Sequence, residues 1–147
     1  MALAVSCNGM RLVPASLDAP EGLEAFMVEF AEGERGVGGS NDYRPAEDTM
    51  ADVVAYSRLG HALNDALLHH GGNVGYYVKR SERRKGYGRL VLALTLAEGR
   101  KRGLQRFLLT VDSDNPGSIR VIEANGGVLE DERVDPKGCK FRRYWIG

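Results

Sequence analysis

The chain has 147 residues, of which 43% are hydrophobic and 27% are charged, and 20 Lys and Arg balance 20 Asp and Glu. We therefore expect residues 1–147 to form a single globular domain with its own core. The zero net charge argues against nucleic acid as the main partner, and no apolar run is long enough to span a bilayer. The two distant cysteines fit neither a zinc site nor a disulfide framework, so a cytoplasmic location is expected.

The first part of the chain predicts few regular elements. Residues 10–13 are a short apolar run typical of a strand, and residues 21–32 carry apolar side chains at helical spacing. Residues 33–45 are rich in glycine and indicate a loop. Residues 53–59 have the composition of a strand but little alternation, and residues 61–70 indicate a short helical or irregular excursion.

From residue 73 onwards the pattern is clearer. Residues 73–79 predict a strand, and residues 86–102 predict a helix whose wide apolar coverage indicates burial against a sheet. Residues 107–111 are nearly all apolar, as expected of a strand covered on both faces. Asn115 followed by Pro116 then predicts the N-cap and first turn of another helix.

The chain closes with a predicted hairpin. Residues 128–134 and 139–146 have strand character, and the turn chemistry of residues 135–138 separates them. The order from residue 73 is strand, helix, strand, helix, strand, strand, which predicts an α/β fold with a parallel start and an antiparallel end.

A basic, glycine-rich turn joins the strand at 73–79 to the helix that follows it. Gly86 and Gly88 stand where this helix should begin. The first N–H groups of a helix have no partner within the helix, the helix dipole favours negative charge there, and glycine lets a phosphate approach the backbone. The pattern indicates a site for a phosphate-bearing cofactor, although a solvated turn before a helix is the alternative for these residues alone.

The turn reads Arg83-Arg84-Lys85-Gly86-Tyr87-Gly88, which resembles the Arg/Gln-x-x-Gly-x-Gly/Ala acyl-CoA motif of the GCN5-related N-acetyltransferase (GNAT) superfamily. Residues 71–88 and residues 112–130 are similar to one bacterial branch of predicted acetyltransferases, as is the Arg-Arg-Tyr-Trp-Ile ending. The resemblance covers about residues 60–146.

The resemblance implies a mixed sheet that is splayed between the strands at 73–79 and 107–111, with the pantetheine arm of acetyl-CoA in the cleft. It implies transfer of an acetyl group to the primary amine of a small molecule or peptide by direct attack. The amides of residues 84–89 would bind the pyrophosphate. The cofactor-binding residues that it implies are Val78, Arg80, Arg83, Arg84, Lys85, Gly86, Tyr87, Gly88, Arg89, Asn115 and Ser118.

Acetyl transfer requires a base that takes a proton from the amine and an acid that gives a proton to the leaving thiolate. An alkylamine has a pKa of about 10.4 and must lose a proton before or during attack, and Asp112, Glu130 and His61 are the candidate bases. The leaving thiolate, with a thiol pKa of about 8.5, is able to take a proton from a tyrosine, and Tyr144, Tyr77 or water are the candidates. The three histidines lack the spacing of a metal site.

Two departures from the family pattern leave alternatives open. Ile122 stands where typical members have the tyrosine that protonates the thiolate, and the chain before residue 60 looks shortened by a helix and a strand. A catalytically impaired acyl-CoA-binding or regulatory module is therefore the first alternative, and a nucleotide- or phosphate-binding protein is the second. An exposed strand edge in the shortened half would make a homodimer possible.

Overall fold

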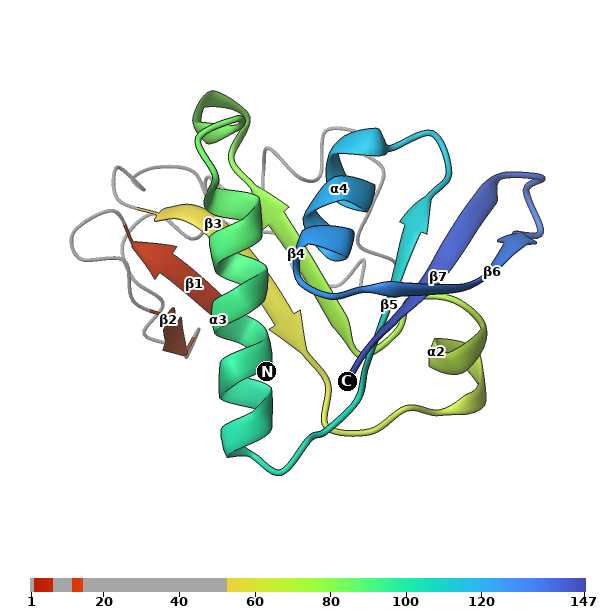
Figure 1. The fold of residues 1–147 in the computed structure, drawn as a ribbon, viewed down its shortest axis with the longest axis horizontal. Helices are drawn as coiled ribbons and strands as arrows, with labels where there is room; N and C mark the ends of the chain where they lie inside the picture. The colour runs from red at the N-terminus through yellow and green to blue at the C-terminus, as the bar shows by residue number, and fades with distance from the viewer. Residues whose placement is uncertain (1, 7–11, 15–52) are drawn as a thin grey trace, which may run out of the picture.

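The computed structural model describes residues 2–6, 12–14 and 53–147 (Figure 1). The helix expected at 21–32 and the loop expected at 33–45 lie outside the described residues. The short strand expected at 10–13 falls partly within them, in β2 (Leu12–Pro14).

The first sheet is antiparallel, with the order β2-β1-β3-β4. The strand expected at 53–59 is confirmed as β3 (Val53–Leu59), and the strand at 73–79 as β4 (Val74–Val78). β1 (Ala2–Ser6) is a strand that sequence analysis missed. Because β1 pairs with β3 along most of its length, the edge of β3 is covered, and the short β2 becomes the edge strand.

The second sheet contains the C-terminal hairpin. Its order is β5-β7-β6, and both pairings are antiparallel. β5 (Phe107–Asp112), β6 (Val128–Val134) and β7 (Lys140–Ile146) confirm the expected strands within one residue. The turn before β7 is also confirmed, since the Gly138 N–H donates to the Asp135 carbonyl at 2.9 Å.

The two sheets meet at one point, the start of β4. The Asn73 N–H donates to the Leu108 carbonyl at 3.0 Å, and the Leu108 N–H donates to Asn73 Oδ1 at 2.8 Å. The second acceptor is a side-chain oxygen, which takes the place of the backbone carbonyl that a β-ladder would supply. Gly72 must be glycine here, because its φ is +64° and a Cβ would lie 2.1 Å from the Leu108 carbonyl oxygen. Past this junction no ladder joins β4 to β5 in the described chain, and Figure 1 shows the two strands running the same way and drawing apart. The expected splay is therefore present, between two sheets rather than within one.

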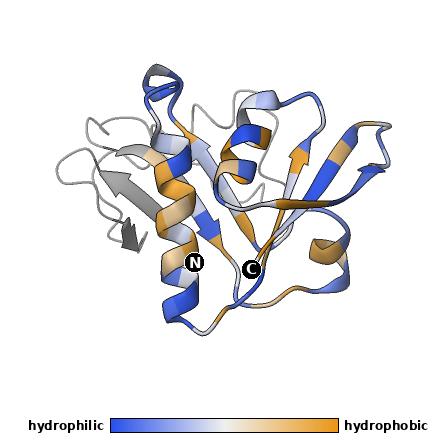
Figure 2. Cartoon of the chain, viewed as in Figure 1, coloured by the Kyte–Doolittle hydropathy of each residue, from blue (hydrophilic) through white to orange (hydrophobic). Residues whose placement is uncertain are grey.

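The helices cover the sheets. α2 (Asp65–His69) is short, α3 (Tyr87–Lys101) packs against β3 and β4, and α4 (Pro116–Ala124) lies beside α3. Figure 2 shows hydrophobic residues along the middle of α3 and hydrophilic residues at its two ends. No helix within the described residues is both long and apolar enough to cross a membrane.

One core cluster spans both sheets and both longer helices. Its buried members come from β3, β4, α3, β5, α4 and β7, so the two sheets and the two longer helices share one core. The largest of them are Leu59, Leu92, Phe107, Leu109, Ile122, Tyr144 and Ile146.

Candidate functional site

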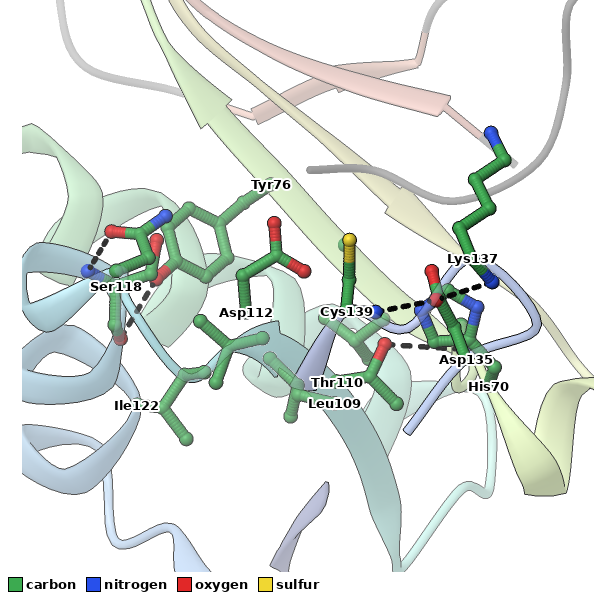
Figure 3. A pocket seen from close by; sticks show the side chains of 15 residues that line it. His70, Tyr76, Leu109, Thr110, Asp112, Ser118, Ile122, Asp135, Lys137 and Cys139 are labelled. Carbon is green, nitrogen blue, oxygen red and sulfur yellow. Dashed lines mark hydrogen bonds between the residues drawn. The ribbon is translucent and has the colours of Figure 1, made fainter. Parts of the chain in front are cut away.

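A cavity of about 250 Å³ occupies the splay between β4 and β5. Its walls come from these two strands, the first turns of α4, the end of α2 and the β6–β7 turn (Figure 3). The lining residues are His70, Gly71, Val74, Gly75, Tyr76, Leu109, Thr110, Val111, Asp112, Asn115, Ser118, Ile122, Asp135, Lys137 and Cys139.

One end of the cavity is formed by the start of α4. Asn115 is the N-cap, as predicted, because its Oδ1 accepts from the Ser118 N–H at 3.1 Å, and Pro116 is the first helical residue. The Tyr76 hydroxyl, which comes from β4, donates to the Ser118 carbonyl at 3.2 Å. The structure therefore brings two of the predicted cofactor residues, Asn115 and Ser118, into the cavity wall.

Tyr76 is a cavity residue that sequence analysis missed. Burial raises the pKa of its hydroxyl to about 12, and the nearby Ser118 side chain, which favours the ionised form, opposes this shift in part. Strand alternation puts Tyr76 on the same face of β4 as Val74 and Val78. That signal was present in the sequence, but it does not say which face borders the cleft.

The other end of the cavity is formed by the turn between β6 and β7. Asp135 Oδ1 accepts from the Lys137 and Cys139 N–H groups, each at 2.8 Å, and this holds the turn over the cleft. The His70 ring lies here too, with its centroid 4.4 Å from that of Phe141. Figure 3 shows the Asp112 side chain between this end and the α4 end.

The glycine turn leads into α3 with its amides uncapped. Gly86 is the N-cap with φ +86°, no described side chain caps this N-terminus, and the first turn has no acidic residue. A Cβ at Gly86 would meet no described atom within 4 Å, so its glycine is required by the backbone angle and its surroundings are open. Arg84 also has a positive φ, of 64°, which is uncommon for a residue with a side chain.

The basic side chains of this turn are exposed, and two of them are engaged locally. Lys85 Nζ lies 2.8 Å from Glu82 Oε2. Arg83 Nε donates at 3.1 Å to the carbonyl of Val78, one of the residues that the resemblance implies for cofactor binding. Gly88 lies where α3 approaches α4, since a Cβ there would be 3.3 Å from Val121. The predicted anion-binding residues that are exposed are Arg80, Arg83, Arg84, Lys85, Gly86 and Arg89.

The residues predicted to handle protons are not brought together. Asp112, at the end of β5, lines the cavity. Glu130 lies on β6, where it accepts from Trp145 Nε1 at 2.9 Å and pairs with Arg143 at 2.8 Å. Tyr144 is 1% exposed and donates to Glu123 Oε1 at 3.1 Å. Neither Glu130 nor Tyr144 is part of the cavity lining.

The other candidates also lie outside the lining. His61 is exposed on the segment before α2, and Tyr77 is 7% exposed on β4 with its ring 5.2 Å from the Arg83 guanidinium. Ile122 does line the cavity, but its side chain has no proton to give. Within the described ranges, no three His, Cys, Asp or Glu side chains are grouped in a way that would hold a metal ion.

Two solved structures with a similar fold are described as acetyltransferases. A putative acetyltransferase, yncA, from Salmonella typhimurium, solved with its cofactor acetyl-CoA, is similar with a TM-score of 0.54 and 20% identity over 67% of this chain and 60% of that one. A mutant spermidine N-acetyltransferase, SpeG, from Vibrio cholerae has a TM-score of 0.53 and 17% identity over 69% of this chain and 62% of that one. The chain thus spans less than two thirds of either structure.

Sequence comparisons point to the same family. The curated proteins give no significant match. The family model described as the acetyltransferase (GNAT) family matches residues 28–126, which include β3, β4, the glycine turn, α3, β5 and α4. This match covers well over half of the chain and contains the glycine turn and the cavity residues from His70 to Ile122, but not those of the β6–β7 turn. The chain belongs to the GNAT acetyltransferase family.

Proposed function

We propose that the chain is an N-acetyltransferase that moves the acetyl group of acetyl-CoA to a primary amine by direct attack. The observation that carries this proposal is the N-terminus of α3, which begins after Gly86 and has no side-chain cap, together with the cavity between β4 and β5. Such an arrangement suits a ligand with an anionic end and a long, mostly neutral arm, which is the chemistry of acyl-CoA.

The pyrophosphate would lie on the first turn of α3. The N–H groups there lack side-chain caps, and the helix dipole adds favourable positive potential. Arg84 and Arg89 are exposed on either side of the turn, and Lys85 is held near it by Glu82. The positive φ of Arg84 is consistent with a function, because strained backbone persists where the surrounding structure or a ligand requires it.

The pantetheine arm would lie in the cleft between β4 and β5. Its amides need backbone partners, and the divergence of the strands past Asn73 leaves the facing edges of β4 and β5 without a shared ladder in the described chain. The Val78 carbonyl accepts from Arg83, but a carbonyl has two lone pairs, so an amide of the arm can share this oxygen. Asn115 and Ser118 line the same cavity and supply polar contacts at its α4 end.

Asp112 is the candidate base with the best placement. Of the candidate bases it is the one that lines the cavity, whereas the Glu130 carboxylate is engaged by Trp145 and Arg143. A carboxylate at this place attracts the acceptor as an ammonium ion, which must lose one proton to water before its nitrogen is able to attack. After the amine attacks, its nitrogen carries a positive charge and becomes much more acidic, and Asp112 takes the released proton directly or through one water.

The function is tested by two measurements on the wild-type chain. Calorimetry should show that acetyl-CoA binds and that ATP binds much more weakly. A thiol-release assay over a panel of small-molecule and peptide amines should then show acceptor-dependent release of CoA. Binding of acetyl-CoA without turnover on any amine would favour an acyl-CoA-binding module, and a preference for ATP would overturn the proposal.

The base is tested by comparing two carboxylate variants. Asp112→Asn should lower kcat by at least about a hundredfold while acetyl-CoA still binds, because it removes the proton acceptor at similar size. Glu130→Gln should have the smaller effect. If Glu130→Gln is the more damaging change, the assignment of the base to Asp112 is wrong.

A further inference from the structure

The Tyr76 hydroxyl is placed where the reacting sulfur of the cofactor would lie. Tyr76 is two residues before Val78 on β4, about 6.6 Å further towards the junction at Asn73. An arm that starts at the α3 N-terminus and passes Val78 must reach Tyr76 next. The ring also lies against the first turn of α3, since a Cβ at Gly88 would be 3.9 Å from its Cε2 atom.

Breaking the thioester places negative charge on sulfur. The thiol of CoA is an alkyl thiol with a pKa of about 8.5, so the departing thiolate is basic and gains from a hydrogen-bond donor. At the α4 end of the cavity the lining side chains with an O–H group are Tyr76 and Ser118, and Ile122 beside them is apolar. Figure 3 places Cys139, Asp135, Lys137 and His70 towards the opposite end, with Asp112 between the two ends.

We propose that Tyr76 is a catalytic residue whose hydroxyl donates a hydrogen bond to the sulfur of the departing CoA. This inference rests on the proposed acetyltransferase function. The amine nitrogen bonds to the acetyl carbon, the carbon–sulfur bond breaks, and its electron pair goes to sulfur. The Tyr76 proton stabilises that pair, while the proton of the nitrogen leaves through Asp112.

The hydrogen bond that Tyr76 makes in this structure can be exchanged at small cost. At 3.2 Å it is longer than is usual for a hydroxyl donor. Its acceptor, the Ser118 carbonyl, also faces the N–H of Ile122 one turn later in α4, as helix geometry requires. Rotation about the C–O bond therefore turns the proton into the cavity without leaving Ser118 unsatisfied. Because burial raises the pKa of Tyr76 to about 12, the hydroxyl keeps this proton at neutral pH.

The direct test uses CoA itself and needs no acceptor. The ultraviolet absorbance of the thiolate, followed against pH, gives the pKa of the CoA thiol bound to the protein. Donation by Tyr76 should lower this pKa below that of free CoA, and Tyr76→Phe should raise it again by about one unit. Tyr77→Phe is the matched control, because it removes the same group from the next residue of β4, outside the cavity lining, and it should leave the thiol pKa unchanged.

Kinetics separate this role from a structural one. With an accepted amine, Tyr76→Phe should lower kcat about tenfold and leave the KM for acetyl-CoA nearly unchanged, because the donated bond forms as the sulfur departs. The inference is overturned if CoA binds both proteins and its thiol pKa is the same in wild type and Tyr76→Phe. Failure of the wild-type chain to bind CoA would overturn the proposed function, and the inference with it.

Discussion

Gly86 offers the sharpest test of where the pyrophosphate binds. Its φ of +86° disfavours any side chain, whereas a Cβ there meets no described atom within 4 Å. Gly86→Ala and Gly86→Glu should therefore lose similar stability, about 1 kcal/mol, from the backbone angle alone. For a chain of this length that corresponds to a fall in Tm of about 3 °C, measurable by thermal unfolding. The two variants then differ only in the carboxylate.

That carboxylate would stand at the α3 N-terminus where the pyrophosphate is expected. Two like charges a few ångströms apart near a protein surface repel by about 3 kcal/mol, which weakens acetyl-CoA binding roughly 100-fold relative to Gly86→Ala. Calorimetry with acetyl-CoA measures this difference, and S-acetyl-pantetheine, which has no pyrophosphate, should bind the two variants equally. Equal acetyl-CoA affinity of Gly86→Glu and Gly86→Ala would refute the placement.

Three further substitutions test the scaffold around the site. Asn73→Ala leaves the buried Leu108 N–H without its acceptor, so the free energy of unfolding measured in urea should fall by about 1–3 kcal/mol. An unchanged urea midpoint would mean that this hydrogen bond does not stabilise the junction of the two sheets. Arg84→Gly removes the side chain at a residue whose φ is 64°, so it should raise the free energy of unfolding by about 1 kcal/mol while weakening acetyl-CoA binding. A lower free energy of unfolding would show that the backbone at Arg84 is not strained. Gly99→Ala gains helix propensity but puts a Cβ 2.4 Å from the Phe107 ring, so the free energy of unfolding should fall by about 1 kcal/mol. A more stable variant would show that the Phe107 ring moves aside at little cost.

The part of the fold after residue 73 was predictable because local signals agree with tertiary structure there. The Asn115–Pro116 start of α4 and the turn before β7 are set by residues close in sequence, and both are confirmed. β1 carried no comparable signal. Its five residues lack a clear alternation of apolar and polar side chains, and the strand is defined by long-range pairing with β3.

At the candidate site, the starts of the two helices were predictable from the sequence, whereas the side-chain contacts on β6 were not. The glycine turn and Asn115 lie where a local motif puts them, at the starts of α3 and α4. The direction of a side chain on β6 depends instead on register, and the pairing with β7 shifts between Leu129 and Asp131. Glu130 therefore meets Arg143 and Trp145, which composition and spacing do not reveal.

The cleft itself depends on single side chains placed by tertiary structure. Asn73 takes the place of a backbone partner for Leu108, and this ends the contact between the two sheets at the start of β4. Tyr76 becomes a cavity residue because that face of β4 looks onto α4, where it reaches the Ser118 carbonyl. Neither role follows from residue type or periodicity, since an Asn before a strand and a Tyr within it are ordinary.

The central claim is that acetyl-CoA lies between β4 and β5 with its pyrophosphate on the first turn of α3. Titration of the isotope-labelled chain with acetyl-CoA, followed by amide NMR, tests this claim most directly. The largest shifts are predicted for the amides of residues 84–89, for β4 and for Asn115, with β6 nearly unaffected. Saturable shifts that spare the α3 N-terminus and gather elsewhere would contradict the account.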